Sequence, residues 1–146
     1  MEVPAVVVLA SLVAGSTALG LVWLAFNGRV SRRTGREIVR ARELGVTALG
    51  SHATLLQLST TVCAPCRTAH RVLGTIAKER FSVKHLDVDL ERRPDLAARF
   101  GVLQTPTILI LDGRGRVRAR IGGAPRPEAV RVELDRILSA PELEAA

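Results

Sequence analysis

The chain has 146 residues, a formal net charge of +7, and only 3% aromatic residues. This length suits one compact domain with a short appendage. About half of the basic excess falls in residues 29–45, which carry six Arg and two Glu, and the other basic residues are scattered. Because surfaces that bind nucleic acid combine clustered basic side chains with aromatic stacking platforms, this composition argues against a nucleic-acid partner.

The first segment, residues 3–26, contains no charged residue and consists mostly of Val, Leu and Ala. About 20 apolar residues are enough to cross the hydrocarbon core of a bilayer as a helix. A cleaved signal peptide is the alternative, but such peptides start with basic residues and have a shorter apolar core, whereas this chain starts Met1-Glu2. We therefore expect residues 3–26 to be a retained, single-pass transmembrane helix in the cell membrane.

The charges that flank this segment predict its orientation. Only Glu2 and the α-amino group precede it, whereas six arginines follow it within residues 27–45, which we expect to be a basic juxtamembrane linker or a short helix. The positive-inside rule then places these arginines, and the domain after them, in the cytoplasm. The same side chains can contact anionic lipid head groups. The six are Arg29, Arg32, Arg33, Arg36, Arg40 and Arg42.

From residue 46 onward the hydrophobic pattern alternates between strand and helix periods, which is typical of an α/β domain. The first strand–helix–strand unit implies parallel strands with a right-handed crossover. A hairpin turn at residues 112–115 then adds antiparallel strands. We expect a small mixed sheet with helices on both faces over residues 46–140, followed by a tail, residues 141–146. The expected strands are residues 46–49, 54–58, 82–88, 107–111 and 116–121, and the expected helices are residues 65–80, 94–100 and 127–138.

The only two cysteines lie in the motif Cys63-Ala64-Pro65-Cys66, at the start of an expected helix. Unpaired backbone N–H groups and the helix dipole favour a thiolate on the first cysteine of such a motif. Pro65 suits the first helical turn, where its missing N–H costs nothing. The motif therefore predicts a redox-active dithiol.

Two other interpretations of the cysteines are weaker. They could be inert core residues, although a proline between them at a helix start argues against this. They could also bind zinc with His52, His70 or His85, but the second closely spaced ligand pair of structural zinc sites is missing. Covalent haem attachment needs His directly after the second cysteine, where this chain has Arg67. We expect neither a metal nor a cofactor.

The order of elements, the Cys motif and a Thr-Pro-Thr segment at residues 105–107 together resemble the thioredoxin superfamily. In that family the proline of this segment is cis and lies against the dithiol, and cis X–Pro bonds are rare enough to be informative. Residues 100–107 resemble the family's approach to this proline, and residues 87–89 resemble the end of its central strand. Gly122 matches the glycine that leaves room for a bound peptide. The resemblance covers about residues 46–140.

This resemblance implies a thioredoxin-like fold and thiol–disulfide exchange with protein disulfides. Cys63 would be the nucleophile that forms a mixed disulfide, and Cys66 would resolve it. Pro106 would shape the substrate groove together with Gly122, and the backbone of Thr105 would pair with the substrate as an added strand. An electron donor, not identifiable from the sequence, would then reduce the dithiol again.

The chain departs from the family pattern around the dithiol. Val62 stands where most members have Trp, and Ala64-Pro65 replaces the usual Gly-Pro. Gln57 stands where most members have a buried Asp that helps to deprotonate the second cysteine, and an amide cannot ionise. We expect Gln57, Ala64 and Pro65 to support the site, and His70 to be a surface or packing residue rather than a proton relay.

The sequence thus predicts a thiol–disulfide oxidoreductase that reduces protein disulfides at the membrane surface, since the cytosol keeps dithiols reduced. One alternative has the domain outside, where it would act on envelope or apocytochrome disulfides. The other is a non-catalytic binding module whose dithiol senses the redox state. Turnover of a disulfide substrate separates the enzyme from the module, and thiol labelling of intact cells separates the two orientations.

Overall fold

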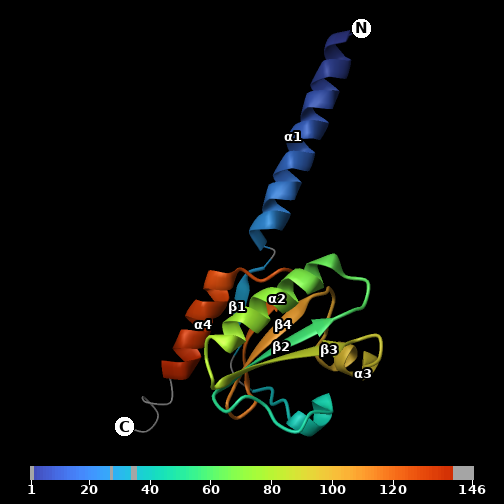
Figure 1. The fold of residues 1–146 in the computed structure, drawn as a ribbon. Coiled ribbons are helices and arrows are strands. Elements are labelled where there is room, and N and C mark those ends of the chain that lie inside the picture. Colours follow the sequence, from blue (N-terminus) through green and yellow to red (C-terminus); the bar gives the residue numbers. More distant parts are fainter. Residues whose placement is uncertain (1, 27, 34–35, 140–146) are drawn as a thin grey trace.

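The computed structural model of the chain describes residues 2–26, 28–33 and 36–139. The predicted tail and residues 27, 34 and 35 of the predicted linker lie outside the described residues. The chain begins with a helix, α1 (Glu2–Phe26), which extends away from a domain of strands and helices (Figure 1). Within α1, residues Pro4–Ala25 are long and apolar enough to cross a membrane, and none of the span is buried against the domain. A signal sequence would meet the same criterion of length and composition.

The domain contains a five-stranded mixed sheet in the order β1-β5-β4-β2-β3. β2 and β3 pair in parallel, and every other neighbouring pair is antiparallel. Helices lie on both faces, as the sequence predicts (Figure 1). The strands are β1 (Val30–Arg32), β2 (Ala53–Ser59), β3 (Val83–Asp89), β4 (Thr107–Asp112) and β5 (Val117–Gly122), and the helices of the domain are the 3-10 helix η1 (Ala41–Leu44), α2 (Ala64–Lys78), α3 (Pro94–Arg99) and α4 (Pro127–Ser139).

Each face of the sheet has its own hydrophobic core, because successive side chains of a strand point to opposite faces. Leu55 of β2 packs in the core under α2 and α4, whereas its neighbour Leu56 packs in the core on the α3 side. All seven residues of β2 are buried, which fits a central strand covered on both faces. β5 alternates buried apolar residues with partly exposed arginines and glycine, as its sequence predicts.

The region between α1 and β2 differs from our expectation. We expected a linker or short helix in residues 30–44, but β1 pairs with β5 there and η1 follows. Val39 and Leu44 are buried in the core on the α3 side. The strand expected at residues 46–49 is wrong: in that stretch the structure has no strand, and the apolar side chains of Val46 and Leu49 cover the core from a loop.

The other predicted strands and helices are confirmed, with ends shifted by one or two residues. The hairpin at residues 112–115 is also present, since the Gly115 N–H donates to the Asp112 carbonyl at 2.9 Å. The mixed α/β fold could therefore be read from periodicity, while the first strand could not.

The position of the only tryptophan gives a first testable expectation. Trp23 lies in α1, and the chain has no tyrosine. We expect a fragment that begins at residue 29 to lack any redox-dependent indole emission, because it contains no tryptophan. Fluorescence spectra of this fragment recorded before and after reduction check this, and a redox-dependent indole emission would contradict it.

Candidate dithiol site

The two cysteines lie at the beginning of α2 and form a disulfide. Cys63 caps the helix: its backbone is extended, and its sulfur accepts a hydrogen bond from the Cys66 N–H at 3.2 Å. Pro65 occupies the first turn, where no N–H is needed. Both cysteines are largely buried, with 8% of Cys63 and 4% of Cys66 exposed. The start of α2 therefore supplies the Cys66 N–H to the sulfur of Cys63, an arrangement that stabilises a thiolate.

The ends of three strands place the other predicted site residues near this helix start. The peptide bond between Thr105 and Pro106 is cis, as the resemblance implies. Thr105 lies beside the loop that leads to Cys63, because its Oγ1 is 3.5 Å from Oγ1 of Thr60. The Pro106 carbonyl accepts from the Gly123 N–H at 2.7 Å, which holds the end of β5 against the proline.

Gly122 lies in the same cluster and allows a close approach. A Cβ at this position would lie 2.4 Å from Nε2 of Gln104, the residue just before Thr105. The structure therefore brings Thr105, Pro106 and Gly122 together at one edge of the sheet.

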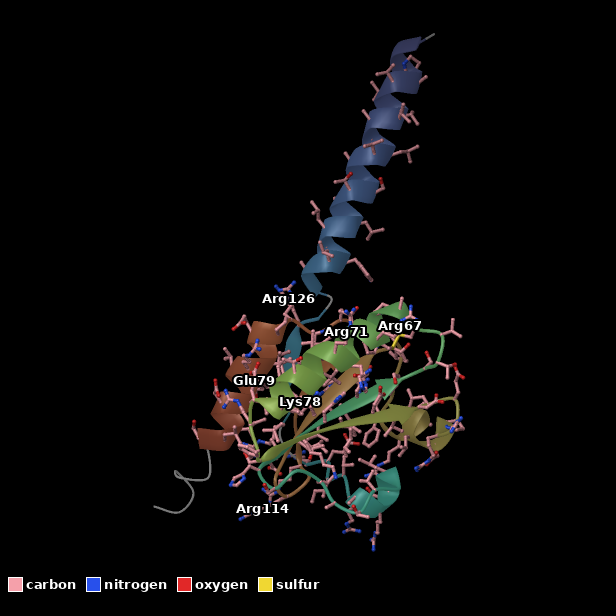
Figure 2. All side chains as sticks on the ribbon, viewed as in Figure 1. Arg67, Arg71, Lys78, Glu79, Arg114 and Arg126 are labelled. Atoms are coloured by element: carbon pink, nitrogen blue, oxygen red, sulfur yellow. A yellow bond between two sulfur atoms is a disulfide. The ribbon has the colours of Figure 1, made fainter. Side chains whose placement is uncertain are left out.

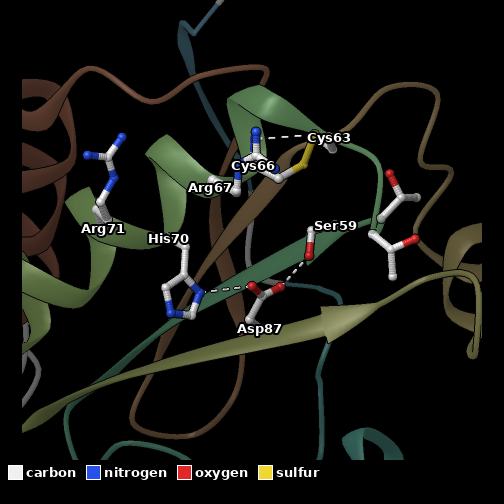
Figure 3. A pocket seen from close by; sticks show the side chains of 9 residues that line it. Ser59, Cys63, Cys66, Arg67, His70, Arg71 and Asp87 are labelled. Atoms are coloured by element: carbon white, nitrogen blue, oxygen red, sulfur yellow. Dashed lines mark hydrogen bonds and ion pairs between the residues drawn. A yellow bond between two sulfur atoms is a disulfide. The ribbon is translucent and has the colours of Figure 1, made fainter.

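A cleft of about 610 Å³ opens beside the sulfurs on the β3 side. Figure 3 shows how side chains from β2, α2 and β3 converge on it. Thr105, Pro106 and Gly122 are not among its lining residues, so the cleft and the cis-proline cluster are separate surfaces. The lining residues are Ser59, Thr60, Thr61, Cys63, Cys66, Arg67, His70, Arg71 and Asp87.

Gln57 is fully buried under α2 and connects two groups. Its Nε2 donates to the backbone carbonyl of Cys66 at 3.0 Å. Its Oε1 lies 3.2 Å from Nε2 of His85. Because a carbonyl oxygen only accepts, Nε2 of His85 carries a hydrogen in this arrangement. Gln57 thus holds the first turn of α2 on the sheet without contributing a charge.

A second pair of polar groups lines the cleft, and we did not predict it. His70 Nδ1 lies 2.9 Å from Asp87 Oδ2, and Ser59 Oγ donates to Oδ1 of the same carboxylate. His70, expected to be a surface or packing residue, therefore takes part in the polar wall of the cleft. Two features of the sequence indicate that these residues lie near the cysteines. His70 is four residues after Cys66, which places both on one face of the helix. The parallel pairing of β2 with β3 brings Asp87 next to β2.

The rings of His70 in α2 and His85 in β3 lie against each other. Their ring centroids are 4.8 Å apart in an edge-on arrangement. Burial lowers the pKa of His85 below its ordinary value, His70 lowers it further, and Asp87 partly opposes the shift. His85 is therefore held neutral as the hydrogen-bond partner of Gln57.

This lowered pKa makes stability depend on pH. Below the ordinary pKa of 6.5 the unfolded chain binds a proton at position 85 more readily than the folded chain. We therefore expect the free energy of unfolding to fall as the pH drops through that value, until the folded-state pKa is passed. Urea unfolding at about pH 8 and about pH 5.5 measures this, with His85→Gln as the control that keeps an amide N–H for Gln57. An equal pH dependence in both proteins would show that His85 is not its source.

Among the residues that the structure describes, no three His, Cys, Asp or Glu side chains gather as metal ligands would. The site consists of a disulfide at a helix start, a cleft lined by the His70–Asp87 pair, and the cis-proline cluster.

Comparisons with known proteins agree on the family. The thioredoxin family model matches residues 45–135. Thioredoxin from Porphyra purpurea is 34% identical over 65 residues, which are 44% of this chain and 61% of that protein. Thioredoxin from Listeria monocytogenes is 36% identical over 69 residues, which are 47% of this chain and 67% of that protein. The chain thus spans about three fifths to two thirds of the length of these relatives.

Solved structures show the same fold. A mutant thioredoxin from Halobacterium salinarum superposes with a TM-score of 0.58 at 19% identity, covering 69% of this chain and 87% of that one. Chloroplastic thioredoxin z superposes with a TM-score of 0.55 at 24% identity, covering 61% of this chain and 80% of that one. At these identities the superpositions show the fold alone. Since the family model covers more than half of the chain and the Cys pair lies inside the matched region, the chain belongs to the thioredoxin family.

Proposed function

We propose that the chain is a thiol–disulfide oxidoreductase that reduces protein disulfides through Cys63 and Cys66 at a membrane surface. The observation that carries this proposal is the position of the two cysteines: they lie at the start of α2, within bonding distance, beside an open cleft. A structural disulfide would need no such cleft.

The reaction has two exchanges, and each conserves the number of S–S bonds. The Cys63 thiolate attacks one sulfur of the target disulfide, and the other target sulfur leaves as a thiolate. The Cys66 thiolate then attacks the Cys63 sulfur, and the first target sulfur leaves. The target ends as two thiols, and the enzyme ends with the disulfide seen here. A separate electron donor must reduce that disulfide before the next cycle.

We assign the cis-proline cluster to substrate binding. The backbone of Thr105 precedes β4 and is free to pair with an extended segment of the target, Pro106 shapes the groove, and Gly122 leaves room for the target backbone. Ala64 is exposed and small, so it allows the target to approach Cys63. Gln57 and Pro65 keep the first turn of α2 in place.

In the second exchange the proton of Cys66 needs an acceptor, and Gln57 cannot provide one. His70 and Asp87 are the ionisable pair that shares the cleft with Cys66, so we assign them this role.

We expect His70→Gln to slow release of the target while leaving formation of the mixed disulfide unchanged. The slowing should lie toward the low end of the roughly 10²–10⁴-fold that positioned acid–base groups contribute, since solvent also reaches the cleft. Rapid-quench kinetics separate the two exchanges. His52→Gln, an exposed histidine outside the cleft, is the control. If both variants match the wild type in the second exchange, His70 does not take up the proton.

We further propose that α1 anchors the domain in the cell membrane, with lipid as a partner and the domain on the cytoplasmic side. The apolar span Pro4–Ala25 and the arginines that follow it support this orientation. Labelling of reduced Cys63 with a membrane-impermeant thiol reagent tests it. Labelling only after lysis supports the cytoplasmic side, whereas labelling of intact cells supports the outward-facing alternative.

Steady-state reduction of a soluble disulfide protein, with dithiothreitol as donor, tests whether the chain is an enzyme. We expect turnover by the full chain in detergent and none by Cys63→Ser. A wild-type rate equal to that of Cys63→Ser would favour the non-catalytic, redox-sensing module instead.

A further inference from the structure

The strands place all parts of the dithiol site at one edge of the sheet. β2 ends at this edge with Ser59, just before the Cys loop, and β4 begins there with Thr107, just after Pro106. β5 ends there with Gly122, because Gly122 pairs with Thr107. These strand ends lie at one end of the sheet. We call them, together with the Cys loop and the cis-proline loop, the active-site edge; the term does not refer to an edge strand.

The apolar helix reaches the domain at the same edge. β1 runs antiparallel to β5, with Val30 opposite Ile121, so β1 starts where β5 ends. Just before β1, the Gly28 N–H donates to the Gly122 carbonyl at 2.9 Å. A Cβ on Gly28 would lie 2.4 Å from the Ala124 carbonyl oxygen, so the chain passes very close to this loop.

Little chain separates this contact from the apolar span. The span ends at Ala25, and three residues cover at most about 10 Å even when extended. A second contact lies nearby, since Nη2 of Arg126 is 3.5 Å from the carbonyl oxygen of Leu24. If α1 crosses a membrane, the active-site edge is therefore held against the head groups.

The side chains at this edge suit such a position. Val62, next to Cys63, is 93% exposed, and Leu103, two residues before Thr105, is 96% exposed. Single exposed apolar residues are ordinary on a protein surface. Here, however, two of the most exposed apolar side chains of the described domain flank the dithiol, and the span that anchors the chain ends at the same edge.

Basic side chains surround these apolar residues. Arg67 and Arg71 are one turn apart on the exposed face of α2, and Arg126 directly precedes α4. All three lie on the side of the domain nearest α1, whereas Arg114 lies at the opposite end (Figure 2). Carboxylates also lie at this edge, and each is hydrogen-bonded within the domain: Glu91 accepts from Thr61, Asp87 from Ser59, and Asp89 from the Glu91 N–H. Guanidinium groups beside exposed apolar side chains match the interface of an anionic bilayer.

We propose that the active-site edge rests on the anionic head-group layer of the membrane, so that the dithiol reduces disulfides presented at the lipid surface by membrane proteins rather than by freely diffusing ones. This inference rests on the proposed function, because it needs α1 to be inserted. The inference adds two points to the proposed function: the direction in which the dithiol site faces and the class of substrate that the site admits.

The test places a reporter tryptophan at each edge of the domain in the full chain. Trp23→Phe removes the native indole, and Val62→Trp or Leu103→Trp places one at the active-site edge. Phe81→Trp is the matched control, since Phe81 is also fully exposed but lies between α2 and β3 at the opposite edge. Each protein is reconstituted into vesicles of phosphatidylcholine and phosphatidylglycerol that contain a lipid with a quencher near the head group.

We expect quenching several-fold stronger at positions 62 and 103 than at position 81. Arg67→Glu combined with Arg71→Glu should reduce the quenching at position 62 in anionic vesicles, whereas Arg114→Glu, the same charge change at the far end, should leave it unchanged. Equal, weak quenching at all three positions would overturn the inference.

Two further measurements distinguish a failure of the proposed function from a failure of this inference. Flotation of the vesicles and turnover of a soluble disulfide in detergent are measured on the same proteins. Protein that does not float with the vesicles would overturn membrane anchoring and the inference with it. Protein that floats and turns over substrate, but is not quenched at positions 62 and 103, would overturn the inference alone.

Discussion

The Cys66→Ser variant of the full chain is expected to accumulate as mixed disulfides with its targets, and the Cys63→Ser variant is expected to form none. Cys63 caps α2 and its sulfur accepts from the Cys66 N–H, so it is the better-stabilised thiolate and the attacking group. Cys66 lies one turn further in and resolves the mixed disulfide. Without Cys66 the first exchange proceeds and the second cannot.

Non-reducing electrophoresis of cells that produce each variant measures this difference. We expect bands of higher mass for Cys66→Ser that disappear on reduction, and no such bands for Cys63→Ser or for the double variant. Capture by Cys63→Ser alone would reverse the two roles. No capture by either variant would favour the redox-sensing module, and captured proteins that all reside outside the cell would favour the outward-facing orientation.

A fragment that begins at residue 46 is expected to be unfolded, whereas a fragment that begins at residue 29 is expected to fold. The shorter fragment retains the region matched by the family model almost completely, but it lacks β1 and η1. It therefore loses Val39 and Leu44 from the core on the α3 side. It also loses Arg32, whose Nε lies 3.2 Å from the buried carboxylate of Glu133 in α4.

The magnitudes favour unfolding. Losing the Leu44 side chain alone costs about 2–5 kcal/mol. Glu133 keeps its ion pair with Arg136 at 3.5 Å, but it loses the hydrogen bond from Arg32, and a hydrogen bond to a charged group contributes about 1.5–3 kcal/mol. Total stabilities of single domains are only about 5–15 kcal/mol. Circular dichroism and urea titration of both fragments measure the outcome, and equal denaturation midpoints would contradict a structural role for residues 30–44.

Point variants in the longer fragment support the same test. Leu44→Ala should lower the free energy of unfolding by about 2–5 kcal/mol. Ile38→Ala, an exposed neighbour on the same segment, should change it by less than about 0.5 kcal/mol.

The contrast between β1 and β2 explains how much of the fold the sequence could predict. β2 is a central strand with continuous burial, so its apolar run is visible without any knowledge of its partners. β1 has three residues, only one of them apolar, and its partner β5 is about ninety residues away in the sequence. A period of two cannot be recognised over three residues, and the surrounding arginines resemble a membrane flank. The opposite error occurred at residues 46–49, whose apolar residues cover the core from a loop.

The site was predictable to the extent that its residues are close in sequence. The Cys motif and the cis bond at Pro106 follow from local patterns and from the resemblance to thioredoxins, and the structure has both the disulfide and the cis bond. The contact of His70 with Asp87 depends on how α2 lies across β3, which no local pattern specifies. The direction in which the site faces depends on the pairing of β1 with β5, and that pairing was not predicted.

The central claim, that Cys63 and Cys66 pass an electron pair to a protein disulfide, is tested most directly by a single turnover without added reductant. Fully reduced full chain is mixed with an excess of a disulfide protein, the reaction is quenched with an alkylating reagent, and both proteins are weighed by mass spectrometry. We predict one new Cys63–Cys66 disulfide for each substrate disulfide that is reduced. Substrate that stays oxidised while both cysteines of the folded chain remain open to alkylation would contradict the claim.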